Sequence, residues 1–245
     1  MKEKIKTNLE KLFNQNYELI KGSSFQDIVE KLIEKNPDAY YMDSSSIRSL
    51  FEDEDIAILE ESKQNKRLAK LFESAKDELK VDNQMIERIK KDITDSIEII
   101  RNKVKTENKG LKNQIIFLEY DSDPYAYFCG FGEGEYPILE IPKYVKFNYR
   151  EELFNGIGKI SYAEFWNKRI MLDELLEELD LSDLIWSSEI YQGLQDAYKF
   201  KTNLLLYEAF ERIPIETFVG IPIKFPLFIF GNEHDCEAMN VYLYE

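Results

Sequence analysis

The sequence predicts an α+β fold, in which a helical N-terminal region is followed by a mixed region with a mainly antiparallel sheet and two long helices. Apolar residues recur at helical spacing through the first 110 residues, whereas the rest of the chain passes from short apolar runs to helices and back. Composition changes at the same place, since 7 of the 33 aromatic residues precede residue 111 and 26 follow it. We therefore expect two regions, residues 1–110 and 111–245.

Helical periodicity is clearest in four segments of the first region. They run from about Lys4 to Ile20, over Phe25–Ile33, over Leu68–Leu79 and over Ile86–Val104. Ser23 and Ser24 stand between the first two segments and are suitable N-cap residues. The isoleucine stripe of the last segment fits core packing, or else the seam of a dimerising coiled coil, although strict heptad spacing is not kept.

The second region contains two pairs of apolar runs around a helical middle. The expected elements are strands over 114–120 and 125–131, joined by the turn 121–124; a third strand over 137–145; helices from Ser161 to Leu181 and from Ser187 or Glu189 to Arg212; and a closing hairpin of 227–230 with 240–244.

Charge is divided as unevenly as the aromatic residues. Residues 1–110 contain 21 Lys+Arg and 23 Asp+Glu, a net charge of −2, whereas residues 111–245 contain 11 and 24, a net charge of −13. An acidic region attracts a basic partner, and a pI near 4.7 disfavours direct binding to nucleic acid or to anionic lipid. We expect a basic protein partner, no direct nucleic-acid contact and no membrane contact.

A group of acidic residues is interleaved with leucines in and just after the predicted helix over 161–181. These residues are Asp173, Glu174, Glu177, Glu178, Asp180 and Asp183. Helical spacing puts them opposite a stripe of Leu172, Leu175, Leu176 and Leu179. Only Lys168 and Arg169 lie nearby to offset the charge. The group is either a solvated helix face or a docking surface for a basic partner.

Two further places offer weak metal-ligand candidates. Asp121 and Asp123 follow an apolar strand, as the carboxylates of a D-x-D motif do when they bind a divalent cation, but the same residues are also typical of a hairpin turn. His234, Asp235 and Glu237 stand together in a short segment that contains the single histidine of the chain. Neighbouring residues rarely converge on one ion, so a polar hairpin loop is the other interpretation.

Motifs of the familiar enzyme classes are missing. The sequence has no nucleophile elbow, no Walker A motif and no C-x-x-C pair, although Cys129 and His234 would form a nucleophile pair if their segments were adjacent. We expect a non-catalytic protein without a cofactor. Two cysteines in 245 residues, no apolar leader at the N-terminus and no run of about 20 apolar residues predict a cytoplasmic location.

The stretch Pro142–Phe147, followed by Asn155-Gly156, resembles the Smi1/Knr4-like immunity superfamily. The resemblance implies an intracellular bacterial protein that neutralises a toxin by binding it. Our hypothesis is an immunity-type protein that sequesters a basic partner, such as a nuclease-type toxin, through its acidic surface. The alternatives are a metal-dependent enzyme with a site near Asp121, Asp123 and His234, and an acidic mimic of nucleic acid.

Overall fold

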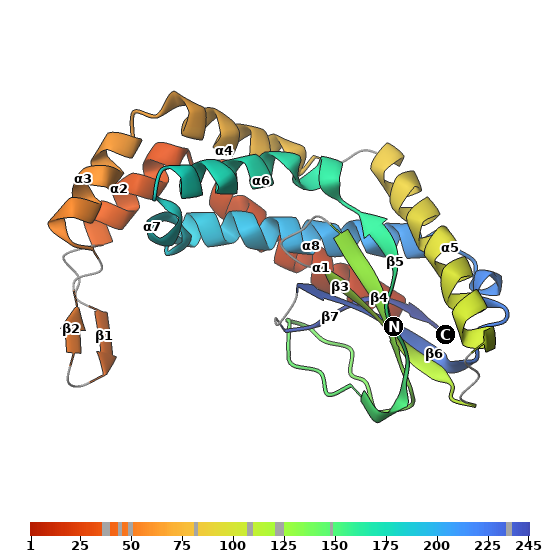
Figure 1. Cartoon of the computed structure of the whole chain (residues 1–245). Coiled ribbons are helices and arrows are strands. Elements are labelled where there is room, and N and C mark those ends of the chain that lie inside the picture. Colours follow the sequence, from red (N-terminus) through yellow and green to blue (C-terminus); the bar gives the residue numbers. More distant parts are fainter. Residues whose placement is uncertain are drawn as a thin grey trace. The chain divides into compact units, whose positions relative to one another are not determined.

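The computed structural model describes residues 1–35, 40–43, 46–48, 51–80, 83–106, 110–120, 125–147, 149–233 and 237–245. The fold is α+β, as predicted (Figure 1). Along the chain, its elements are α1 Lys2–Lys21, α2 Phe25–Lys35, β1 Tyr40–Asp43, β2 Ser46–Arg48, α3 Asp53–Ser62, α4 Lys66–Glu78, α5 Asn83–Thr106, β3 Asn113–Tyr120, β4 Tyr125–Phe131, the short 3-10 helix η1 Tyr149–Glu151, β5 Glu152–Ser161, α6 Ala163–Glu178, α7 Ser182–Trp186, α8 Glu189–Glu211, η2 Ile215–Phe218, β6 Ile223–Glu233 and β7 Met239–Tyr244.

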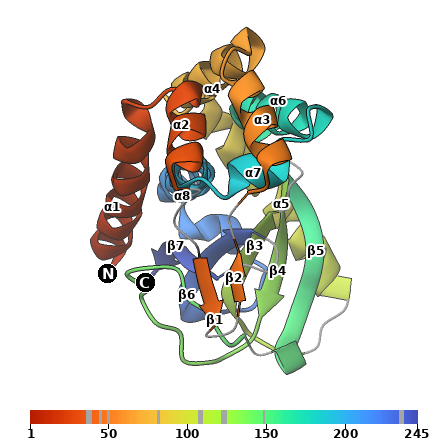
Figure 2. The same cartoon turned by 90° about the vertical axis from the view of Figure 1, so that its left-hand side faces the viewer.

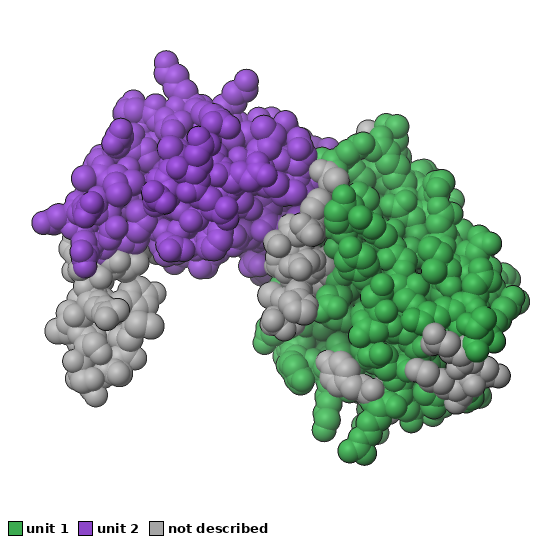
Figure 3. Space-filling view, in the orientation of Figure 1, with its two compact units in different colours: residues 1–13, 81–164, 199–245 green, residues 14–80, 165–198 purple. Residues whose placement is uncertain are grey.

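The chain divides into two compact units, each built from segments that are far apart in sequence (Figure 3). Unit 1 comprises residues 1–13, 81–164 and 199–245, and unit 2 comprises residues 14–80 and 165–198. The boundary that we expected at residue 110 is not where this division falls. The reason is packing: α5 lies against β5 within unit 1, whereas α6 and the start of α8 hydrogen-bond to α4 within unit 2.

The sheet of unit 1 has the strand order β5-β4-β3-β6-β7. The predicted hairpin of β3 and β4 is confirmed, and so is the closing hairpin of β6 and β7. The expected mainly antiparallel sheet is corrected to a mixed one, because β3 and β6 pair in parallel. The physical reason is that the chain leaves β5 at one edge, runs through helices, and returns beside β3 pointing the same way, which a tight turn cannot achieve.

Strand β5 occupies a segment in which we predicted no strand. Gly156 and Gly158 have φ values of +62° and +70°, and the register with β4 shifts repeatedly, so the strand is bulged and has no clean alternation. Ser161 ends this strand, and helix α6 begins only at Ala163. The bulges interrupt the alternation of apolar and polar residues, which is why no strand signal was visible in the sequence here.

Residues 137–145, predicted as a third strand, form only a single bridge between Lys143 and Ala238. Side chains hold this segment instead. The Asn240 amide oxygen accepts from the Leu139 N–H at 2.6 Å, and its amide nitrogen donates to the Pro137 carbonyl at 3.1 Å. Prolines cannot donate to a strand ladder, which is why an apolar run here did not become a strand.

Helix α5 covers the edge of the sheet at β5 (Figure 2). Two of its side chains satisfy backbone donors of the edge strand: Ser96 Oγ accepts from the Lys159 N–H at 3.1 Å, and Asp92 Oδ2 accepts from the Ser161 N–H at 3.1 Å. The isoleucine stripe of this helix, which comprises Ile86, Ile89, Ile93, Ile97 and Ile100, is buried. The stripe is therefore core packing rather than a free coiled-coil seam.

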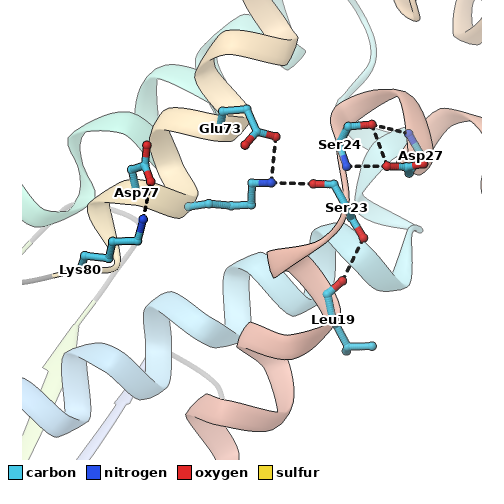
Figure 4. Close-up of polar contacts among 8 residues, drawn as sticks. Leu19, Ser23, Ser24, Asp27, Glu73, Asp77 and Lys80 are labelled. Atoms are coloured by element: carbon cyan, nitrogen blue, oxygen red, sulfur yellow. Dashed lines mark hydrogen bonds and ion pairs between the residues drawn. The ribbon is translucent and has the colours of Figure 1, made fainter.

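In unit 2, the turn between α1 and α2 is closed by a reciprocal N-cap (Figure 4). The Ser24 N–H donates to Asp27 Oδ2 at 2.6 Å, and the Asp27 N–H donates to Ser24 Oγ at 3.2 Å. The first of these bonds is the main reason that the pKa of Asp27 is lowered. Lys76 of α4 donates to the Ser23 carbonyl at 2.6 Å, so α4 is tied to the same turn.

The contact between α5 and β5 can be tested with two glycine substitutions. Gly156→Ala should lower the free energy of unfolding by about 1–2 kcal/mol, because an alanine at positive φ is strained. Gly158→Ala should cost more, because a Cβ there would lie 2.4 Å from Ser96 Cβ, whereas nothing lies within 4 Å of a Cβ at Gly156. Urea unfolding measures the free energy of unfolding of both variants. Equal losses of stability in the two variants would contradict the close approach of Ser96 to Gly158.

Candidate acidic surface

Helix α6 ends in a left-handed turn that decides which side chains reach solvent. Asp180 has a φ of +55°, and the Leu181 N–H donates back to the Leu176 carbonyl at 2.8 Å, as in a Schellman motif. Leu172, Leu175 and Leu176 are buried as expected. Leu179, which we placed in the same stripe, is 36% exposed, because the turn carries Leu181 into the core in its place.

Five of the six predicted acidic residues are exposed: Glu174, Glu177, Glu178, Asp180 and Asp183. We call these five residues the acidic surface. Glu178 pairs with Arg67 at 3.6 Å. The other four carboxylates form no ion pair with any residue that the structure describes. Their negative charge is therefore directed to solvent.

Asp173 differs from the expectation and does not belong to the acidic surface. Its side chain is only 21% exposed, and it accepts a hydrogen bond from the Tyr191 hydroxyl. Arg169 approaches it at 3.4 Å, with its guanidinium group over the Trp166 ring. The physical reason is that α8 supplies a hydroxyl to this side of α6, which a pattern within α6 alone does not reveal.

Glu78 forms a second half-buried carboxylate site in unit 2, which the sequence did not indicate. It accepts from the Tyr198 hydroxyl at 2.9 Å and from the Lys168 N–H at 2.8 Å. Burial raises the pKa of Glu78, and the two hydrogen bonds only partly oppose this effect. Glu78 belongs to α4, and its two partners belong to α8 and α6, so the site joins three helices of unit 2.

Charge is divided unevenly between the two units, as it is between the two halves of the sequence. By sequence, unit 2 contains 23 acidic and 12 basic residues, a net charge of −11, whereas unit 1 contains 24 and 20, a net charge of −4. Residues 165–198 alone contain 8 acidic and 2 basic residues. The unit that carries the acidic surface therefore also carries most of the net charge.

The candidate metal ligands are only partly covered by the structure. Asp121, Asp123, His234 and Asp235 lie outside the described residues, and Glu237 is exposed. Within the described ranges, no three His, Cys, Asp or Glu side chains are grouped so that they could hold a metal ion.

Cys129 is buried in β4, and its thiol donates to Asn155 Oδ1 at 3.1 Å. Burial raises the pKa of this thiol to about 11. Because the thiolate is the nucleophilic form, Cys129 is poorly suited to covalent catalysis near neutral pH. The proposed partner His234 lies outside the described residues.

Compared with protein-family models, with curated proteins and with solved structures, the chain matches none of them. The resemblance to the immunity superfamily gains no support from these comparisons and stays a prediction. Its two parts lie in different surroundings, since Pro142–Phe147 is outside regular strands and Asn155-Gly156 is within β5. Of the helices that the structure describes, none combines the length and the apolar run needed to cross a bilayer.

The state of Cys129 can be read from its reaction with iodoacetamide at pH 7 in a Cys236→Ser variant. We expect slow alkylation in the folded protein and fast alkylation in denaturant, because burial keeps the thiol neutral. Alkylation of the folded protein at the rate of the denatured protein would contradict this assignment.

Glu78→Gln should change how stability depends on pH. The folded-state pKa is raised, so the folded protein binds a proton at Glu78 more tightly than the unfolded chain does, and wild-type stability falls as pH rises through this window. The Gln variant lacks this loss. Relative to wild type, it should gain stability as pH rises above the ordinary pKa range of a glutamate, about 4.3.

Urea unfolding at a series of pH values measures the difference in the free energy of unfolding between wild type and Glu78→Gln. Glu174→Gln, which removes one exposed carboxylate from α6, is the matched control. If the free energies of unfolding of wild type and Glu78→Gln differed by the same amount at all pH values, the raised pKa of Glu78 would be contradicted.

Proposed function

We propose that the chain is a non-catalytic binding protein that captures a basic protein partner through the acidic surface of α6 and α7. The most specific form of this proposal is an immunity-type protein that neutralises a nuclease-type toxin in the bacterial cytoplasm. The observation that carries the proposal is the set of exposed carboxylates, of which only Glu178 has a cationic partner among the described residues.

The acidic residues at the C-terminal end of α6 do not stabilise this helix. The C-terminal end of a helix carries a partial negative charge, and cations rather than anions are favourable there. Helix α6 has no basic residue in its last turn, while Glu177, Glu178 and Asp180 lie at that end. Repulsion at this helix end is relieved when a basic partner binds, which supports a binding role over a purely structural one.

Apolar side chains accompany the charges. Trp186 of α7 is 40% exposed, and Leu179 lies at the end of α6. Asp183 and Trp186 are three residues apart on α7 and so share one face of this helix. A charged surface raises the rate of association, and an exposed tryptophan is a typical residue to supply much of the binding energy.

Charge reversal tests the proposal. In a Glu174→Lys, Glu177→Lys, Glu178→Lys variant, we expect the affinity for the basic protein captured from a lysate of the source organism at low salt to fall by about a hundredfold, since several charge pairs are lost at once. The affinity of the wild type should also fall steeply as salt is raised. Isothermal titration calorimetry measures both effects.

The matched control reverses three exposed acids of unit 1, in Glu3→Lys, Glu10→Lys, Glu98→Lys, and changes the net charge by the same amount. This control should bind almost as tightly as wild type. Equal losses in the two variants would show that net charge alone acts, and would contradict the assignment to α6 and α7. If short duplex DNA displaces the chain from its partner, the nucleic-acid mimic is the better description.

A further inference from the structure

Unit 2 contains a pocket of about 520 Å³ between the turn that joins α3 to α4 and the turn that joins α6 to α7. Ile58 and Leu179 supply its apolar surface, Leu181 also lines it but is almost fully buried, and Glu61 and Asp180 supply two carboxylates. Asn65 supplies an amide. The volume is within the range of pockets that hold small ligands or a few side chains.

The charges of this pocket select a cationic occupant. Glu61 and Asp180 both line it, and no Lys or Arg is among its described lining residues. The N-terminus of α4 does not favour an anion here, because Asn65 Oδ1 already accepts from the N–H groups of Arg67 and Leu68 at 3.0 and 3.2 Å. An anionic ligand would thus meet two carboxylates without compensation.

The pocket also adjoins the acidic surface. Asp180 belongs to both, and Leu179 follows Glu178 directly in the chain. A left-handed position at a helix end usually holds glycine or asparagine, so the aspartate at this position supplies a carboxylate to the pocket where the backbone does not require one. A partner that is drawn to the acidic surface reaches this pocket through the same turn.

We infer that the pocket takes an arginine or lysine side chain, with an apolar neighbour, from a segment of the basic protein partner. The long aliphatic stem of such a side chain packs on Ile58 and Leu179 while its cationic end meets the carboxylates. This inference rests on the proposed function, because it names the group of the partner that the acidic surface recognises.

The probe is the tripeptide acetyl-Arg-Leu-Arg-amide, with acetyl-citrulline-Leu-citrulline-amide as a neutral control of the same shape. Titration of ¹⁵N-labelled protein is followed in NMR spectra by the side-chain amides of Gln64 and Asn65 and by the backbone amide of Leu181, all of which line the pocket. We expect these signals to move and saturate with the arginine peptide and to stay unchanged with the citrulline peptide.

The test variant is Glu61→Gln, Asp180→Asn, in which asparagine tolerates the left-handed backbone. Because each exposed ion pair changes an affinity by about fivefold at most and the variant removes two carboxylates, we expect the dissociation constant of the arginine peptide to rise about five- to tenfold. The matched control, Glu18→Gln, Glu34→Gln, removes two exposed carboxylates of unit 2 outside the pocket and should bind as wild type does.

The outcomes separate this inference from the proposed function. If the variants of the acidic surface lose the protein partner while Glu61→Gln, Asp180→Asn binds the arginine peptide as wild type does, the pocket inference is wrong and the proposed function stands. If no basic protein binds the wild type in a salt-dependent way, the proposed function fails. Equal signal changes with the citrulline peptide, or tighter binding of free spermidine, would each overturn the assignment of the pocket to a protein side chain.

Discussion

The return of the chain to the sheet after β5 is the constraint on which the rest of the structure depends. Strand β5 lies at one edge of the sheet, and the next strand of the chain, β6, is separated from it by β4 and β3. Strands β5 and β6 both run in the same direction as β3. No short turn can make this connection, so it contains α6, α7 and α8. Within unit 2, α2 contacts α7, and Glu78 of α4 accepts hydrogen bonds from α6 and α8. The mixed sheet and the discontinuous units therefore have one origin.

The same connection carries the features that we assign to function. The left-handed turn at Asp180 ends α6, buries Leu181 and leaves Leu179 beside the pocket. The acids of α6 serve two purposes, because the half-buried Asp173 accepts a hydrogen bond from the Tyr191 hydroxyl of α8, whereas Glu174, Glu177 and Glu178 are exposed. Asp173 joins α6 to α8, and the exposed acids are those that we propose bind a basic partner.

Periodicity within one segment was enough to predict α1, α5, α8 and the hairpin of β3 and β4, because their apolar residues alternate with the period of the element. Contacts between distant segments were not predictable. No strand was predicted around Gly156 and Gly158, because their positive φ values and the contact of this bulged segment with α5 cannot be read from local alternation. Likewise, the exposed acids of α6 could be found by helical spacing, but the burial of Asp173 depends on Tyr191, and the pocket depends on Glu61 of α3.

Carboxyl footprinting would test the central claim most directly. Labelling with carbodiimide and glycine ethyl ester, followed by mass spectrometry, compares the reactivity of each carboxylate in the free chain and in its complex with the captured basic protein. The account predicts protection of Glu174, Glu177, Glu178, Asp180 and Asp183, with Glu3, Glu10 and Glu98 unchanged. Protection confined to unit 1, or unchanged labelling of α6 and α7 in a saturated complex, would contradict it.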